Sequence, residues 1–230
     1  MQADTLDSLY KLRPNTNCDI AIEYTFYEVC YSKEHLQAFW TMHKLTKKSI
    51  KGSQKRTNNF KQDDRFHPTI GSRDYRGSGY DRGHLVPAGD MKLNRTAMSE
   101  TFFMTNMSPQ RSGFNSGVWA ALESGLRKEV LKRGDALVIT APILTPFTNY
   151  PRIRSGVSIP DEYYKIAYFP DEQVMLAFLI PNFSQKGKKY QTFQVTVDEL
   201  EFLTGINFFE DLDDEIEEEL ESEFYKLSEL

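Results

Sequence analysis

The sequence is poor in cysteine and has no long apolar run, and each absence excludes a class of protein. Two cysteines, Cys18 and Cys30, in 230 residues are too few for a scaffold built on disulfides or for a cysteine-ligated zinc site. The sequence does not decide whether these two cysteines form a disulfide with each other. No segment approaches the roughly 18 to 20 apolar residues that span a bilayer, and residues 1–13 lack the apolar core of a signal peptide. We therefore expect a soluble globular chain with no membrane partner.

The sequence also lacks internal repeats, low-complexity blocks and a flexible linker. Its 10 prolines and 13 glycines are scattered along the chain rather than gathered in one stretch. Because linkers between domains are usually rich in such residues, we expect one domain over residues 1–230.

Charge is unevenly distributed behind the net value of −5. Residues 209–230 contain 11 Asp or Glu against one lysine, and we expect residues 210–223 to form an exposed acidic helix. Residues 1–208 carry a net charge of +5, and residues 44–133 contain 18 basic against 8 acidic side chains. A basic body of this kind suits a surface that meets phosphates, although an evenly solvated basic surface gives the same composition.

Runs of aromatic and β-branched residues predict five strands. They are residues 20–31, 39–45, 136–141, 163–169 and 174–180. Turns are predicted at residues 32–34 and at Pro170–Asp171, and the polar stretch 47–80 is expected to form long surface loops.

Two helices are predicted besides the acidic one. Apolar residues at spacings of four predict a helix over residues 117–133 that ends at Gly134. Thr196 stands three residues before Glu199, as in a capping box, and predicts a helix over residues 196–204.

Residues that can carry chemistry are concentrated in three boxes. They are Tyr80-Asp81-Arg82-Gly83-His84, Asn106-Met107-Ser108-Pro109-Gln110, and the run from Phe114 to Glu123. A lone histidine is more often structural than catalytic, and we interpret His35, His43 and His67 in that way. His84 differs because an arginine, a glycine and a polar stretch that leads to a helix stand beside it.

Asn115, Trp119, Glu123 and Arg127 follow one another at intervals of four. If the helix begins near Asn115, they share one face. A surface ion pair between Glu123 and Arg127 is the structural alternative.

Together these boxes resemble the DNA/RNA non-specific endonuclease family of the ββα-metal superfamily, in its endonuclease G-like group. The resemblance extends from the Tyr24 region to Leu203-Thr204-Gly205 and covers most of the chain. It implies an α+β fold in which a largely antiparallel central sheet is flanked by helices, with a ββα-metal element around His84 and the Asn115 helix. One departure is Thr140-Ala141-Pro142, where the family usually has Thr-Gly-Pro.

The resemblance implies a general base and a metal site. His84 would activate water for attack on a phosphodiester, which a neutral imidazole with an unperturbed pKa of ~6.5 can do. Asn115 would bind the cation directly, and Glu123 would hold it through water. Mg²⁺ suits few protein ligands with several waters, and Mn²⁺ or another divalent cation stays open.

The resemblance also implies residues that bind phosphate or support the site. Arg82, Arg127 and Arg56 would clamp the scissile phosphate, since arginine offers a planar fork of donors. Asn106 and Gln110 would support the active site, while we expect Asp81 to anchor its loop.

The predicted function is Mg²⁺-dependent endonucleolytic hydrolysis of DNA and RNA with little sequence preference. The alternatives are a catalytically silent nucleic-acid-binding relative and a phosphodiesterase for small nucleotides. DNA and RNA are the expected partners, and an inhibitor protein or a homodimer stays open. We expect a secreted or periplasmic location, with the signal peptide absent from the sequence, and a cytoplasmic one stays open.

Overall fold

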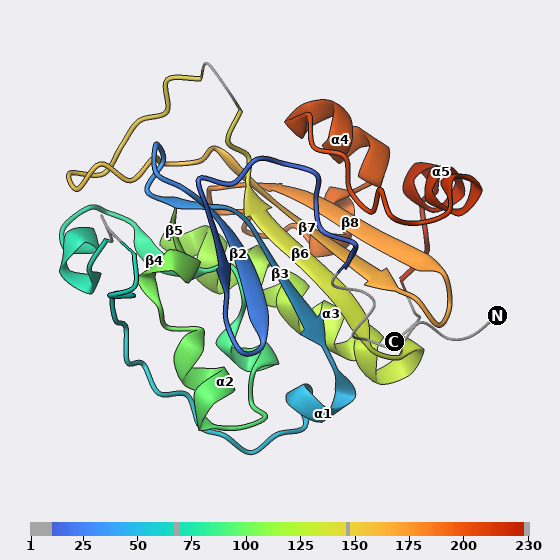
Figure 1. The fold of residues 1–230 in the computed structure, drawn as a ribbon, viewed down its shortest axis with the longest axis horizontal. Coiled ribbons are helices and arrows are strands. Elements are labelled where there is room, and N and C mark those ends of the chain that lie inside the picture. Colours follow the sequence, from blue (N-terminus) through green and yellow to red (C-terminus); the bar gives the residue numbers. More distant parts are fainter. Residues whose placement is uncertain (1–10, 67–69, 146–147, 228–230) are drawn as a thin grey trace.

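A seven-stranded sheet organises the chain (Figure 1). The structure is a computed structural model that describes residues 11–66, 70–145 and 148–227. Neighbouring strands are antiparallel throughout, in the order β1-β2-β3-β6-β7-β8-β9. Their bounds are β1 Ile20–Glu23, β2 Tyr27–Ser32, β3 Gln37–Leu45, β6 Ala136–Pro142, β7 Glu162–Phe169, β8 Val174–Pro181 and β9 Gln194–Val195. The α+β prediction with a largely antiparallel central sheet is confirmed.

Helices cover both faces of this sheet because its central strands are apolar on both sides. Val138 of β6 belongs to one core cluster, with Leu122 of the long helix α3. Ile139, the next residue, belongs to the opposite cluster, with Leu200 of α4 and Leu220 of α5. The helices are α1 Lys47–Ile50, α2 Arg95–Glu100, α3 Ala120–Arg133, α4 Val197–Thr204 and α5 Asp214–Ser222. α3 therefore lies on one face, and α4 and α5 lie on the other.

The prediction of one strand over residues 20–31 is wrong, because this segment forms the β1–β2 hairpin. Tyr24 N donates to Tyr27 O at 2.9 Å and closes the turn. Thr25 is held by the Glu100 carboxylate, which accepts from its backbone N at 3.0 Å and its hydroxyl at 2.7 Å. A contact with α2, distant in sequence, thus divides a segment whose local composition favours a continuous strand.

The other predicted elements are found with small shifts in their bounds. The remaining four strands are present as β3, β6, β7 and β8. α3 begins at Ala120 rather than 117, since residues 114–119 form a wider π-type turn in which Gly117 departs from helical geometry. The predicted capping box at Thr196 is present, and α5 occupies residues 214–222 of the expected acidic helix, which is not exposed throughout because Leu220 and Glu221 are buried.

The polar stretch 47–80 is mostly irregular, as predicted, with α1 at its start and a short 3₁₀ helix at Ser72–Tyr75. His67 lies outside the described residues. The stretch leads into a separate two-stranded sheet of β4 (Asp81–His84) and β5 (Met107–Gln110).

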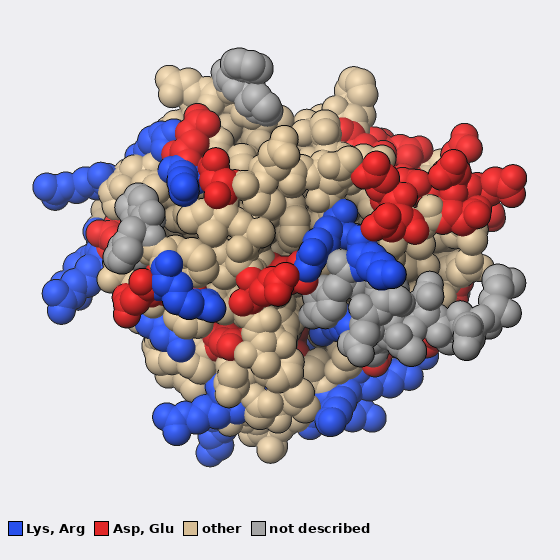
Figure 2. Space-filling view, viewed as in Figure 1, with Lys and Arg blue, Asp and Glu red and all other residues tan. Residues whose placement is uncertain are grey.

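Charge is segregated on the surface as the sequence indicates. Figure 2 shows acidic side chains gathered over the corner that α4 and α5 form, whereas lysines and arginines project mainly from other edges. None of the helices in the described ranges is both long and apolar enough to cross a lipid bilayer.

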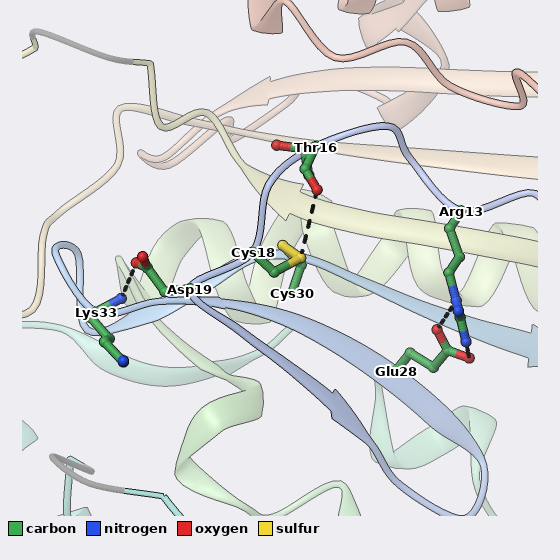
Figure 3. The surroundings of a disulfide bond; sticks show 7 residues. All are labelled: Arg13, Thr16, Cys18, Asp19, Glu28, Cys30 and Lys33. Carbon is green, nitrogen blue, oxygen red and sulfur yellow. Dashed lines mark hydrogen bonds and ion pairs between the residues drawn. A yellow bond between two sulfur atoms is a disulfide. The ribbon is translucent and has the colours of Figure 1, made fainter.

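A disulfide joins Cys18, just before β1, to Cys30 in β2 (Figure 3). Nearby, Arg13 Nε donates to the Glu28 carboxylate at 2.6 Å. The sequence left this pairing open, and in the structure it ties the chain before β1 to the neighbouring strand.

Candidate active site

The two-stranded sheet β4–β5 carries the predicted general base. Asp81 lies opposite Gln110, and His84 lies opposite Met107. Gly83 is required between them, because a Cβ there would lie 2.1 Å from Cδ of Gln110. The glycine of the box therefore makes room for the buried Gln110 side chain, whose amide atoms have no hydrogen-bond partner in the described part of the chain.

His84 is enclosed by aromatic rings and is 9% exposed. The ring centroids of Phe102 and Phe60 lie 4.9 and 5.7 Å from that of the imidazole. Its Nε2 is buried without a partner among the described residues, which leaves Nδ1 as the nitrogen able to meet solvent. Burial, together with the positive charges of Arg56 and Arg82, lowers the pKa of His84 to about 3. The imidazole is therefore neutral near pH 7, the state in which it can accept a proton.

Asn115 lies in the turn before α3, and Asp81 orients its side-chain amide. Asn115 Nδ2 donates to Asp81 Oδ2 at 3.0 Å, and the Ser112 hydroxyl lies 2.8 Å from both oxygens of the same carboxylate. Because the amide nitrogen is engaged, the amide oxygen is the atom left for another partner. Hard divalent cations prefer such oxygen ligands. The residues present thus fit a cation at Asn115, and the contacts of the Asp81 side chain are with Ser112 and Asn115 rather than, as was expected, with its own loop.

Glu123 lies on α3, and a buried lysine is close enough to influence its charge. Burial raises the pKa of the Glu123 carboxyl, while the positive charge of Lys165 acts against that rise. Lys165 is 1% exposed, and its Nζ donates to the Thr140 hydroxyl and, at 3.4 Å, to the Leu85 carbonyl. The ammonium group favours the carboxylate form of Glu123 that can order water around a cation. Thr140 belongs to the segment that departs from the family pattern, and its contact with the site is the hydrogen bond that it accepts from Lys165.

Arg127 is held by a buried acidic side chain. Its Nη1 donates to Asp90 Oδ1 at 2.7 Å, and His43 Nε2 lies 3.1 Å from Asp90 Oδ2. Burial lowers the pKa of His43, so its neutral ring donates from Nε2 to the carboxylate. Burial alone would raise the pKa of Asp90, but His43 and Arg127 bring it below its usual value. His43 therefore has a structural role, as predicted, and its partner fixes a candidate phosphate-binding arginine.

Beside β4 lies a cleft of about 430 Å³ that arginines dominate. Arg56, Arg82 and Asn115, three of the predicted site residues, line it. Arg82 Nη1 donates to Ser72 Oγ at 2.6 Å, and its guanidinium lies 4.0 Å from the Phe60 ring centroid. The 3₁₀ helix at residues 72–75 and the residue after it add Arg73 and Arg76, both exposed. Four guanidinium groups make the cleft suitable for phosphates.

Asn106 holds the backbone that follows His84. Its Oδ1 accepts from Val86 N at 2.9 Å, and its Nδ2 donates to the carbonyls of Val86 and Thr101 at 3.0 and 2.9 Å. The side chain is fully buried, so each of these polar atoms is satisfied by backbone.

The predicted residues converge electrostatically although they come from distant segments. The charge of Arg56 acts on both His84 and Glu123, and the charge of Arg127 also acts on Glu123. Arg127 does not line the arginine cleft, because Asp90 engages it. Sequence reasoning missed the contributions of Asp90, Lys165, Arg73 and Arg76. No pattern marks the first two, whereas the basic content of residues 44–133 is the signal that points to the arginines.

Comparison with known proteins defines the class to which this fold and site belong. A family model described as "DNA/RNA non-specific endonuclease" matches residues 6–215. The chain belongs to the DNA/RNA non-specific endonuclease family, a family of nucleases, and the predicted resemblance is confirmed.

Individual relatives are nucleases as well. The chain is 34% identical over 220 residues to Nuclease C1 of Cunninghamella echinulata var. echinulata, covering 87% of this chain and 86% of that protein. It is 32% identical to the mitochondrial nuclease EXOG of Homo sapiens, covering 83% of this chain and 57% of that protein. A solved structure of the EndoG/EndoGI complex superposes with a TM-score of 0.79 at 27% identity, over 86% of this chain and 89% of that one.

The expectation of a secreted or periplasmic location is wrong by this comparison. Human EXOG is a mitochondrial protein by name, as are the Mitochondrial nuclease of Saccharomyces cerevisiae, 30% identical over 79% of this chain, and Nuclease 1 of Schizosaccharomyces pombe. The chain spans 57% of human EXOG and 63% of the S. cerevisiae protein. The expectation rested on the hazard of a free nuclease inside a cell, and the mitochondrial names of these relatives show that export is not the only location a nuclease of this family can have.

Proposed function

We propose that residues 1–230 form a single nuclease domain that hydrolyses phosphodiester bonds inside DNA and RNA, with Mg²⁺ as its cation and with little sequence preference. The observation that carries the proposal is that strand β4 ends in a neutral, enclosed His84 and begins with Asp81, which holds Asn115 with its amide oxygen open. Membership in a family of non-specific nucleases supports the substrate class.

His84 acts as the general base. Its neutral imidazole takes a proton from a water molecule as that water attacks the phosphorus, and the bond to the 3′ oxygen breaks. The leaving 3′ oxygen takes a proton from a water molecule, and His84 returns its proton to solvent, so the products carry a 5′-phosphate and a 3′-hydroxyl. Phe60 and Phe102 limit the access of bulk solvent to the ring, so the imidazole stays unprotonated between turnovers.

Asn115 would hold the cation directly, and the carboxylate of Glu123 would hold it through water. When bound, the cation stabilises negative charge on the phosphate and on the leaving oxygen. Asp81 fixes the amide of Asn115 with its oxygen available, and Lys165 favours the ionised form of Glu123.

The arginines bind and orient the substrate. Arg56 and Arg82 in the cleft donate to phosphate oxygens, while Arg127 is kept in place by Asp90. Contacts with phosphate and sugar position a polymer without reading its bases, which accounts for low sequence preference. An inhibitor protein stays open as a further partner, because the EndoG neighbour is described as an inhibited complex.

Two assays separate this function from its alternatives. Covalently closed circular DNA and single-stranded RNA are incubated with and without Mg²⁺ over a series of salt concentrations, and product ends are analysed. We expect metal-dependent cutting of both polymers that falls steeply with salt, since phosphate contacts release counterions. Binding without cutting would favour the silent relative, salt-independent hydrolysis of small diesters alone would favour the phosphodiesterase, and 3′-phosphate ends would refute the mechanism.

A further inference from the structure

The corner formed by α4 and α5 carries a cluster of carboxylates that the nuclease site does not use. It lies on the sheet face opposite α3, as the two core clusters show. Figure 2 shows acidic side chains gathered over it, and residues 209–230 contain 11 acidic residues against one lysine. So dense a set of like charges is costly unless something neutralises it.

Three of these carboxylates converge on one point. Asp198 and Glu201 of α4 and Glu221 of α5 each place one oxygen so that all three lie within 4.8 Å of one another. Asp198 is exposed and Glu201 is half-buried, whereas Glu221 is 4% exposed. Two helices that are separate in sequence therefore contribute oxygens to the same site.

Glu221 has a buried oxygen with nothing to satisfy it. Its Oε1 has no hydrogen-bond partner in the described part of the chain, and no described lysine or arginine pairs with any of the three carboxylates. Glu201 is different, because its Oε1 accepts from Phe208 N at 2.6 Å. An unpaired buried carboxylate is strongly unfavourable, so Glu221 requires a neutralising group.

Other features near Glu221 add to its negative surroundings. The negative charges of Glu201, Glu217 and Asp198 all act on Glu221. Glu221 also stands in the last turn of α5, where the carbonyl ends of the helix are negative and no basic residue is present. A bound cation would relieve the helix terminus and the carboxylates together.

We propose that Asp198, Glu201 and Glu221 form a Ca²⁺ site that clamps α5 onto α4, apart from the catalytic cation. Ca²⁺ accepts oxygen ligands at about 2.3–2.6 Å, so two ligands on opposite sides of it lie up to roughly 4.8 Å apart. Mg²⁺ demands a near-ideal octahedron and gives up water reluctantly, so three carboxylates contributed by two helices suit the more flexible coordination of Ca²⁺ better. Three oxygens within 4.8 Å of one another are close enough to share one Ca²⁺ ion, and water completes its coordination.

Calorimetric titration with CaCl₂ tests the site. It is performed on the Asn115→Ala variant, so that the predicted catalytic ligand does not contribute to the heat. We expect one Ca²⁺ per chain, with a Kd on the order of 10–1000 µM, and at least a tenfold weaker Kd after adding Glu221→Gln. Glu218→Gln, an exposed position on the same helix, is the matched control and should leave binding unchanged. Absence of Ca²⁺ binding, or equal binding in the Glu221→Gln variant, would overturn the proposal.

Thermal unfolding gives a readout that does not depend on nuclease activity. Ca²⁺ should raise the Tm of the wild-type chain but not that of Glu221→Gln, while Glu221→Gln should melt above the wild type in EGTA because it no longer buries an ionisable carboxyl group. Asp198→Asn, at an exposed position in the first turn of α4, should lose part of the Ca²⁺ response. The site would be refuted if Ca²⁺ left the wild-type Tm unchanged and Glu221→Gln were more stable than the wild type in every buffer. That result would show that a proton neutralises Glu221.

Discussion

Replacing Asp81 by asparagine tests how the cation ligand is held. The Asp81 carboxylate accepts from Asn115 Nδ2 at 3.0 Å and from the Ser112 hydroxyl at 2.8 Å. In Asp81→Asn one oxygen becomes an amide nitrogen, and the charge that fixes the Asn115 amide is lost. A hydrogen bond to a charged group contributes about 1.5–3 kcal/mol. Loss of a partner that orients a metal ligand typically weakens metal binding about 10- to 100-fold.

The assay is the initial rate of plasmid cleavage over a series of Mg²⁺ concentrations. We expect the half-saturating Mg²⁺ concentration of Asp81→Asn to rise about 10- to 100-fold, with much of the maximal rate recovered at saturation. Ser112→Ala removes only the second donor to Asp81, so its shift should be several-fold smaller. An unchanged Mg²⁺ dependence in a folded Asp81→Asn protein would refute the argument that Asp81 orients Asn115.

The remaining predictions concern the metal ligand and the stability of the site. Asn115→Ala should lose its response to Mg²⁺, and a titration like that of the wild type would rule out direct ligation. Gly83→Ala should lower the free energy of unfolding by about 1–3 kcal/mol, because its Cβ would lie 2.1 Å from Gln110 Cδ; urea unfolding measures this. Asp90→Asn should destabilise by about 3 kcal/mol at pH 7, since a neutral amide replaces the carboxylate that lies 2.7 Å from Arg127, and a loss within error of zero would contradict that role. The pKa of His84 is about 3 in the folded state and ~6.5 in the unfolded state. The stability that depends on a neutral His84 is therefore complete above pH 6.5 and declines as the pH falls toward 3. Between pH 7 and pH 5 the wild type should therefore lose about 2 kcal/mol more than His84→Gln, and parallel losses would show that His84 is not desolvated.

Much of the fold could be predicted because its signals are local. The strands at 136–141, 163–169 and 174–180 are apolar runs that only Thr140 and Lys165 interrupt, as expected for strands buried on both faces, and the Thr196 capping box marks a helix start. The β1–β2 turn could not be predicted in the same way, because Thr25 is held by Glu100 from a helix far along the chain.

The same distinction between local and tertiary signals applies to the candidate site. The box that contains His84 and the helix that contains Asn115 stand out through a resemblance carried by short, ordered motifs. The residues that act on them do not stand out in the sequence. Lys165 looks like an ordinary strand residue and Asp90 like a loop residue, and only the fold shows that each is buried beside its partner. Such roles depend on tertiary contacts, which no periodicity in one sequence encodes.

The most direct test of the account compares the wild type with His84→Ala under single-turnover conditions on covalently closed circular DNA, with DNA affinity measured on the same samples. The account predicts that His84→Ala binds DNA with an affinity close to that of the wild type and fails to cut it at any Mg²⁺ concentration, because the substitution removes the base and leaves the arginine cleft intact. Cutting at a near-wild-type rate by His84→Ala would contradict the assignment of His84 as the base on which the proposed mechanism rests.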